Sequence, residues 1–308
     1  MENSENQKFD YVIIGGGTAG LSSALYAARG GLSVLVLDSA GVGGQALQIT
    51  ELENYPGVFP AVDGVTFIMN MQRQAEQFGA RIVQAAVSSI DKQGDVFVVR
   101  TAKSSYEAKC LCIATGAVHS TLGVPGEKEL AGRGVSYCAT CDGPFFRNKK
   151  IVVVGGGDSA CSEAVYLSAL SKDVTIIHRR DSFRAQQAVV DKMLACGVKP
   201  VFDAVVKSIN GGNKVESVTI ENVKTGGQSQ IEADAVFIFV GMLPKTDLVD
   251  NLKKDKGGYI ITDENMQTSV PGLFAAGDVR SKTFRQIVTA ASDGAVAAHS
   301  VCEKIRNA

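Results

Sequence analysis

The chain has 308 residues, of which 45% are hydrophobic and 20% charged, so it is long enough for two folded domains and has the composition of a globular protein. Its 31 Lys and Arg nearly balance 32 Asp and Glu, leaving a net charge of -1, which argues against nucleic acid or a membrane surface as a general partner. The polar start lacks a signal-peptide pattern and no apolar run approaches a membrane span, so we expect a cytoplasmic protein.

The first predicted element is a strand-turn-helix unit over residues 11–30. An apolar run, YVII, leads into GGGTAG and then into a helical pattern. Gly15, Gly17 and Gly20 have the spacing of a dinucleotide-binding fingerprint, in which backbone N–H groups and a helix N-terminus face a pyrophosphate. The next strand, SVLVL, ends at Asp38, and a carboxylate there suits the ribose hydroxyls of FAD or NAD.

A pair of cysteines, Cys138 and Cys141, follows in the stretch CATCDG. A zinc site is disfavoured because zinc usually takes four ligands and the three histidines are dispersed. A static disulfide would close a very small loop in a compartment that reduces thiols. We favour a reversible dithiol, in which one thiolate attacks an external disulfide and its neighbour resolves the mixed disulfide.

Asp142, directly after this pair, has two interpretations that the residues alone leave open. Asp-Gly is common in turns, but a carboxyl beside a thiol can also act as its general acid and base. The other five cysteines lie in apolar strand or helix patterns, where we expect small hydrophobic core residues. They are Cys110, Cys112, Cys161, Cys196 and Cys302.

A second strand-turn-helix unit, IVVVGGGDSA, repeats the first at a constant offset of 140 residues. Gly155 and Gly157 then correspond to the first two motif glycines, and His178 takes the strand-end position of Asp38. The arginines that follow, Arg179, Arg180 and Arg184, can be a solvated loop, but their position after a glycine motif favours binding of the 2′-phosphate of NADP.

The order of these units predicts an α/β fold of two Rossmann-like, three-layer nucleotide-binding domains. A late apolar strand, GLFAAGDV, has no obvious sheet after the second unit and should return to the first. We therefore predict a discontinuous FAD domain, residues 1–118 and 246–308, and an inserted NADPH domain, residues 119–245, that carries the cysteine pair. The two connecting strands would form a hinge.

Taken together, the motifs resemble the low-molecular-weight thioredoxin reductases, of the class II pyridine nucleotide-disulfide oxidoreductases. They are GGGTAG, GGQ at 43–45, ENYPG at 53–57, CATCDGPFF, GGGDSA, HRRDSFRA, AAGD, and RQ at 285–286. The resemblance spans residues 10–303 and implies a homodimeric enzyme that passes electrons from NADPH through FAD to the cysteine pair and on to thioredoxin. It also implies rotation of the inserted domain on its connecting strands.

The same resemblance implies a role for each matching residue. Cys141 would face the flavin, Cys138 would attack the thioredoxin disulfide, and Asp142 would transfer the proton. The implied FAD contacts are Gly15, Gly17, Gly20, Asp38, Gln45, Asn54, Thr115, Asp278, Arg285 and Gln286. The implied NADPH contacts are Gly155, Gly157, Asp158, Ser159, His178, Arg179, Arg180 and Arg184. Two positions depart from the family: Asp38 replaces a frequent glutamate, and Ser162 stands where many relatives have an acid.

Three alternative functions share some of these motifs. One is a related flavoprotein that reduces another disulfide protein, of the glutaredoxin or peroxiredoxin type, although peroxiredoxin-reducing relatives carry an additional N-terminal region and here the first glycine motif starts by residue 15. Flavoenzymes that reduce ferredoxin generally lack the cysteine pair. The third alternative is a redox-inert regulator that only binds nucleotide.

Overall fold

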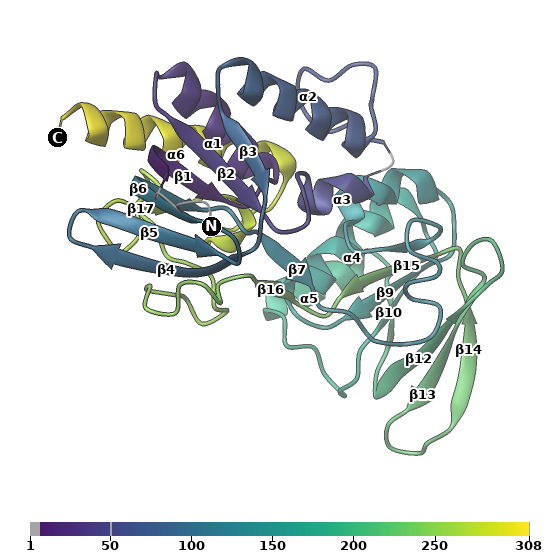
Figure 1. Cartoon of the computed structure of the whole chain (residues 1–308). Helices are drawn as coiled ribbons and strands as arrows, with labels where there is room; N and C mark the ends of the chain where they lie inside the picture. The colour runs from purple at the N-terminus through teal and green to yellow at the C-terminus, as the bar shows by residue number, and fades with distance from the viewer. Residues whose placement is uncertain (1–6, 50, 308) are drawn as a thin grey trace. The chain divides into compact units, whose positions relative to one another are not determined.

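The computed structural model describes residues 7–49 and 51–307. The chain divides into two compact units, which we treat separately (Figure 1). Unit 1 consists of Met1–Val118 and Leu243–Ala308, and unit 2 is His119–Met242. The second boundary therefore lies a few residues before the one that the sequence placed between 245 and 246. The reason is local, because the connecting strands β7 (Ala117–His119) and β16 (Met242–Pro244) pair with each other there.

Unit 1 is built on a sheet in the order β3-β2-β1-β6-β5-β4, with β17 also paired to β6. The strands β1, β2, β3, β6 and β17 run parallel to their neighbours in this group, and β4 and β5 form an antiparallel extension. The strand bounds are β1 Gln7–Ile14, β2 Val34–Asp38, β3 Arg81–Gln84, β4 Val87–Gln93, β5 Val96–Thr101, β6 Ser105–Ile113 and β17 Leu273–Ala275. The pairing of β17 with β6 confirms that the late apolar strand returns to the first sheet.

Helices cover this parallel sheet, and its central strands are buried. The end of β1, YVII, has at most 4% exposure at each residue, because parallel strands packed on both faces need continuous rather than alternating hydrophobicity. The helices are α1 Thr18–Arg29, α2 Gly64–Gln77 and α6 Ile287–Arg306, with short 3-10 turns η1 Gly44–Gln48 and η3 Gly277–Val279. The long helix α6 packs on α1, where a Cβ added to Gly294 would stand 2.1 Å from the Ala19 carbonyl oxygen.

Unit 2 contains a five-stranded, all-parallel sheet in the order β11-β10-β9-β15-β8. A separate antiparallel sheet, β12-β13-β14, contributes to the same hydrophobic core. The strands are β8 Val135–Ser136, β9 Ile151–Gly155, β10 Val174–Ile177, β11 Lys199–Val201, β12 Ala204–Asn210, β13 Ser217–Asn222, β14 Gln228–Glu232 and β15 Ala235–Phe239. The helices are α3 Ala139–Asp142, α4 Asp158–Leu170 and α5 Gln187–Ala195, with the 3-10 turn η2 Gly143–Phe146.

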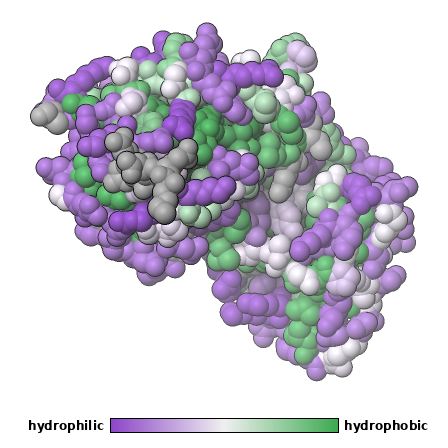
Figure 2. All heavy atoms as spheres, viewed as in Figure 1, coloured by the Kyte–Doolittle hydropathy of each residue, from purple (hydrophilic) through white to green (hydrophobic). Residues whose placement is uncertain are grey.

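The two parallel sheets confirm the predicted α/β architecture with two nucleotide-binding folds. Hydrophilic residues cover most of the surface in Figure 2, with hydrophobic residues among them on the face of unit 1 that is in view. Within residues 7–49 and 51–307, no helix is both long and apolar enough to cross a membrane.

Candidate functional site

The glycine turn after β1 is closely packed in two places and open in a third. Gly15 has φ +110°, and a Cβ there would stand 2.2 Å from the Ala114 carbonyl oxygen. A Cβ on Gly20 would stand 1.9 Å from the carbonyl oxygen of Gly15. Gly17, the N-cap of α1, has no atom within 4 Å of its added Cβ among the described residues. The first and third glycines therefore allow close packing, and the second leaves space at a helix N-terminus for a phosphate.

Asp38 ends β2 beside this turn and is already engaged with backbone. Its Oδ2 accepts the N–H of Gly16 at 2.7 Å, and its Oδ1 accepts the N–H of Ala40 at 2.9 Å. A carboxylate has lone pairs left after two such bonds, so acceptance from ribose hydroxyls stays compatible with this geometry. The side chain also fixes the glycine turn, a role that the sequence motif did not reveal.

The other FAD-contact candidates gather around the carboxyl ends of β6 and β17, which are parallel to β1. Gln45 in η1 donates to the Ala117 carbonyl, and Thr115 donates to the Lys245 carbonyl at 2.6 Å. Asn54 donates to the side chain of Gln286, the N-cap of α6, at 3.3 Å. Residues distant in sequence thus converge on the edge where open α/β sheets bind ligands.

Arg285 lies at the same edge with part of its hydrogen-bonding capacity unused. Its guanidinium stacks over the ring of Tyr259, 4.0 Å from the centroid. Its buried Nε has no hydrogen-bond partner in the part of the chain that the structure describes. A buried donor of this kind is usually paired, so a group with acceptor oxygens fits here.

A largely buried ion network, which the sequence did not predict, holds Asp278 in η3. Lys282 lies 3.3 Å from Asp278 and 3.1 Å from Asp293, and Arg280 lies 2.9 Å from the second oxygen of Asp293. Asp293 also accepts the N–H of Gly277 at 3.0 Å. These four side chains are at most 25% exposed. Helix α6 therefore fixes the turn that carries Asp278.

The second glycine turn, in unit 2, repeats the arrangement, with Ala160 in place of the third glycine. Gly155 has φ +154°, and a Cβ on it would stand 2.5 Å from the Phe239 carbonyl oxygen. Gly157 caps α4 and, among the described atoms, has none within 4 Å of its added Cβ. Asp158 begins α4 and accepts the N–H of Gln186 at 2.8 Å, while Ser159 is exposed. The turn therefore leaves room for a second pyrophosphate.

His178 and Arg184 lie against this turn, and Arg179 and Arg180 follow His178 in the chain. The Arg184 N–H donates to the Gly156 carbonyl at 2.7 Å, and the buried imidazole of His178 stacks on Phe183. Burial and the charges of Arg184, Arg180 and Arg179 lower the pKa of His178. Among the described residues, the His178 Nε2 has no hydrogen-bond partner, and the three exposed arginines form no ion pair. Uncompensated positive charge beside a glycine turn fits a phosphate.

The cysteine pair lies at the carboxyl edge of this same sheet. Cys138 follows β8 and is the N-cap of α3, and the structure joins it to Cys141 in a disulfide with a Cα–Cα distance of 5.3 Å. The Cys141 N–H points at the Cys138 sulfur, 3.3 Å away. Because β8, β15, β9 and β10 are parallel, the pair and the second glycine turn meet at one edge.

Asp142 closes α3, and burial raises the pKa of its carboxyl, with a hydrogen bond from Ser136 acting in the opposite direction. Ser136 is 5% exposed, and its hydroxyl accepts the N–H of Cys138 at 3.1 Å. It therefore contacts both the backbone of the redox pair and the neighbouring acid. The sequence did not single out Ser136, because one serine at a strand end is a common turn feature.

The remaining cysteines are free thiols. Cys110, Cys112, Cys161 and Cys302 are buried as predicted, and burial raises the pKa of Cys112 to about 12. The prediction for Cys196 was wrong: it is exposed, because α5 ends at Ala195 and Cys196 is only its C-cap. Within the described residues, no cluster of His, Cys, Asp and Glu could hold a metal ion.

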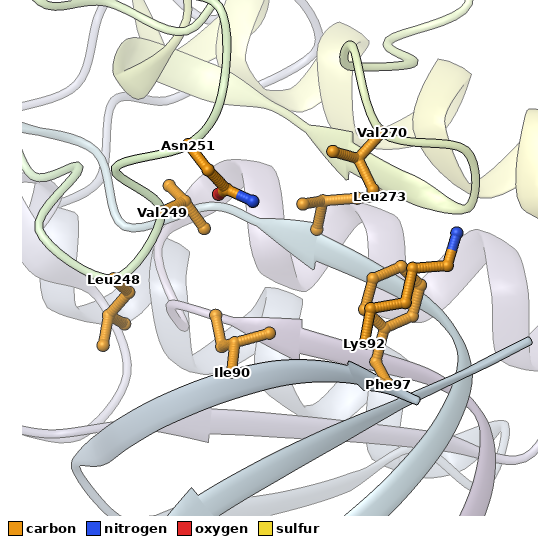
Figure 3. Close-up of a pocket in the computed structure, with 8 residues that line it drawn as sticks. All are labelled: Ile90, Lys92, Phe97, Leu248, Val249, Asn251, Val270 and Leu273. Carbon is orange, nitrogen blue, oxygen red and sulfur yellow. The ribbon is translucent and has the colours of Figure 1, made fainter. Parts of the chain in front are cut away.

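A small cavity of about 50 Å³ lies in unit 1, and none of the candidate site residues lines it (Figure 3). It is lined by Ile90, Lys92, Phe97, Leu248, Val249, Asn251, Val270 and Leu273. The Lys92 amine donates to the Pro271 carbonyl at 2.9 Å and lies 5.4 Å from the centre of the Phe97 ring. Its mostly aliphatic lining offers no convergent polar groups, so it belongs to the packing of the core.

Two parallel sheets, each with an open glycine turn, and a cysteine pair on the second sheet define a class of protein: an oxidoreductase that binds two nucleotides and carries a redox disulfide. The chain belongs to the pyridine nucleotide-disulphide oxidoreductase family, whose model matches residues 9–294.

Two relatives show how closely the chain matches proteins named thioredoxin reductase. It is 50% identical over 298 residues to that of Treponema pallidum (strain Nichols), covering 96% of this chain and 97% of the relative. It is 44% identical to that of Bacillus subtilis (strain 168), covering 97% and 95%.

Two solved structures of thioredoxin reductases are similar along nearly the whole chain. The enzyme of Streptococcus pyogenes MGAS5005 matches with a TM-score of 0.93 at 47% identity, covering 99% of this chain and 100% of that one. The Lactococcus lactis enzyme in its FR conformation matches with a TM-score of 0.67 at 42% identity, covering 97% and 100%.

Proposed function

We propose that this protein is an NADPH-dependent thioredoxin-disulfide reductase. The observation that carries the proposal is the Cys138–Cys141 disulfide at the edge of the sheet that bears the second glycine turn. The family uses FAD and NADPH, and bound FAD would take a hydride from NADPH and deliver the electron pair to this disulfide. The similar thioredoxin reductases support thioredoxin as the protein substrate.

Each unit has candidate residues for one of the two cofactors. We assign FAD to unit 1, with the candidates Gly15, Gly17, Gly20, Asp38, Gln45, Asn54, Thr115, Asp278, Arg285 and Gln286. We assign NADPH to unit 2, with Gly155, Gly157, Asp158, Ser159, His178, Arg179, Arg180 and Arg184. The open turns, the unpartnered Arg285 Nε and the unpaired arginines support this division.

The chain's own thiols then complete the reaction. The Cys138 thiolate attacks one sulfur of the thioredoxin disulfide, which forms a mixed disulfide and releases the other thioredoxin sulfur as a thiolate. The Cys141 thiolate attacks the Cys138 sulfur, so the internal disulfide forms again and the second thioredoxin sulfur leaves. Asp142 exchanges a proton with these sulfurs, and its raised pKa favours the protonated form that such a donor needs.

We further propose that unit 2 rotates on its two connecting strands, so that NADPH and the disulfide reach the flavin in turn. The paired strands β7 and β16 form a compact pivot. Two relatives of similar identity have TM-scores as different as 0.93 and 0.67, which supports a family with more than one domain arrangement.

A homodimer and a cytoplasmic location complete the proposal. Unit 1 exposes apolar side chains on and near α2, including Phe59, which is 96% exposed, and a second copy could cover them. Five free thiols fit a reducing compartment. Sedimentation of the purified protein gives the oligomeric state.

The cysteine variants test the function directly. The purified protein should be yellow, should bleach with NADPH in the absence of oxygen, and should couple NADPH oxidation to thioredoxin. Cys138→Ser and Cys141→Ser should still bleach but lose thioredoxin reduction, because neither can form the internal disulfide. Thioredoxin turnover in either variant contradicts the mechanism, and a panel of other disulfide proteins shows whether thioredoxin is the preferred partner.

A further inference from the structure

Glu127 is a buried carboxylate in unit 2, only 2% exposed, that none of the functions above uses. Its Oε1 accepts the Leu122 N–H at 2.9 Å and the Tyr137 hydroxyl at 2.8 Å, and its Oε2 accepts the Gly123 N–H at 2.7 Å. No Lys, Arg or His among the described residues forms an ion pair with it. Its charge is therefore stabilised by hydrogen bonds, and losing one would leave part of a buried charge uncompensated.

Tyr137 links this carboxylate to the redox pair. It is the residue between Ser136, which ends β8, and Cys138, which caps α3. Burial and Glu127 raise the pKa of Tyr137, so its phenol stays a donor at neutral pH. Because consecutive Cα atoms are about 3.8 Å apart, the position of the Tyr137 ring constrains the backbone of Cys138.

The same ring contacts the connection between the units. The His119 imidazole stacks on the Tyr137 ring, with centroids 5.1 Å apart and planes inclined by 23°. His119 ends β7 and is the first residue of unit 2. We call His119, Glu127 and Tyr137 the brace. It joins the end of the connecting strand, the turn at Leu122 and Gly123, and the entry to the redox helix.

We propose that Tyr137 and Glu127 are positioning residues that make the connecting strand and the redox helix move as one body. The inference rests on the proposed function, in which the disulfide must reach the flavin by movement of unit 2. With the brace intact, a displacement of β7 moves Cys138 by the same amount, because the loop between them does not deform. With the brace cut, Cys138 gains freedom relative to the connection, and a misplacement of about 1 Å at a reacting atom can cost on the order of 100-fold in rate.

Tyr137→Phe and Glu127→Gln test the proposal, with Tyr11→Phe as the matched control. Tyr11 is a buried tyrosine whose hydroxyl contacts the side chains of Ser23, at 2.8 Å, and Cys112, but it lies in β1 of unit 1. Each protein is mixed with NADPH without oxygen, and alkylation at set times counts the thiols at Cys138 and Cys141. Flavin bleaching, ferricyanide reduction and thioredoxin reduction are followed in parallel.

Both brace variants should bleach and reduce ferricyanide within about twofold of the wild-type rates, while thiols appear at the cysteine pair about tenfold more slowly. The kcat for thioredoxin should fall with the thiol rate, and its KM should fall in parallel, because the slowed step precedes the attack on thioredoxin. Tyr11→Phe should keep the wild-type rate of thiol formation and the wild-type kcat for thioredoxin. His119→Phe, which keeps a ring for stacking, should retain more thioredoxin turnover than His119→Ala.

Hydrogen exchange provides a readout that needs no turnover. Amide exchange at residues 120–124 and 137–142 should accelerate in both brace variants and stay unchanged in Tyr11→Phe, because Glu127 holds the N–H groups of Leu122 and Gly123.

Several outcomes would overturn the inference. Wild-type thiol rates in Tyr137→Phe and Glu127→Gln, even with faster local exchange, would mean that the brace only stabilises its turn. Equal losses of ferricyanide and thiol rates would show general damage to the fold. A wild-type protein that forms both thiols but does not reduce thioredoxin removes the proposed substrate and leaves the brace testable by the thiol rates, whereas a wild type without thiol formation removes both proposals.

Discussion

Asp142 has an environment that separates it from an ordinary turn residue. The sequence left a turn and a proton donor as equal interpretations, and burial, which raises the pKa of the carboxyl, favours the second. A raised pKa also determines the direction in which stability changes with pH. The stabilising contribution of the neutral carboxyl is present below its unfolded pKa, about 3.9, and is lost as pH rises through the folded value.

Asp142→Asn should therefore separate catalysis from stability. Thioredoxin reduction should fall by roughly 10²- to 10⁴-fold, because the proposed proton donor is gone, while bleaching by NADPH continues. The variant should gain stability relative to wild type at pH 8 compared with pH 4, as measured by thermal unfolding. Asp191→Asn, which changes an exposed acid on α5, is the control, and an equal loss of thioredoxin turnover there would contradict the role of Asp142.

At the scale of elements, the two glycine turns show why one motif needs a third glycine and the other does not. In the first turn the carbonyl oxygen of Gly15 occupies the place where a Cβ of residue 20 would be. In the second turn Ala160 holds the corresponding position with no exposed surface. The backbones thus approach more closely in unit 1 than in unit 2.

Alanine substitutions at two glycines of the first turn should affect different properties, folding stability in one case and FAD binding in the other. Gly20→Ala forces the backbone apart and should lower the free energy of unfolding by about 1–3 kcal/mol. Gly17→Ala meets open space, so it should cost less than about 1 kcal/mol in folding and should instead weaken FAD binding. Unfolding of the apoprotein and fluorescence titration with FAD measure the two effects, and an unchanged FAD affinity in Gly17→Ala would contradict the placement of the phosphate.

Local patterns predicted the elements well, because strand, glycine turn and helix follow one another within a few residues. Continuous apolar runs predicted the buried strands, and the late strand was assigned to the first sheet because it lacked a partner after the second unit. Ser136, Glu127 and Asp293 escaped prediction. Each is a single polar residue whose importance comes from partners brought close by folding, and Asp293 meets Gly277 across 16 residues of chain.

At the scale of the whole molecule, both connections between the units follow a glycine with positive φ. Gly116 precedes β7 with φ +70°, and Gly241 precedes β16 with φ +130°. Such backbone is strained for other residues, so both positions favour glycine. If unit 2 rotates, the change in backbone angles belongs near these residues.

Gly116→Ala should slow turnover with thioredoxin severalfold at constant flavin content, because it restricts the backbone beside the pivot. Gly226→Ala is a matched control, since Gly226 has φ +72°, lies in unit 2 away from the connections and, like Gly116, has no described atom within 4 Å of an added Cβ. Both changes should cost about 1 kcal/mol in stability. Equal kcat values in the two variants would argue against a pivot at Gly116.

One sheet carries both the second glycine turn and the cysteine pair, on β9 and β8, with β15 between them. Helix α3 packs on α4, so the two sites keep a constant spacing. If NADPH binds at the glycine turn, this rigid unit cannot bring both NADPH and the disulfide against the same flavin ring at once. If unit 2 rotates as proposed, the flavin is reduced by NADPH in one domain arrangement and oxidised by the disulfide in another, so the rate of alternation between them sets an upper limit on turnover.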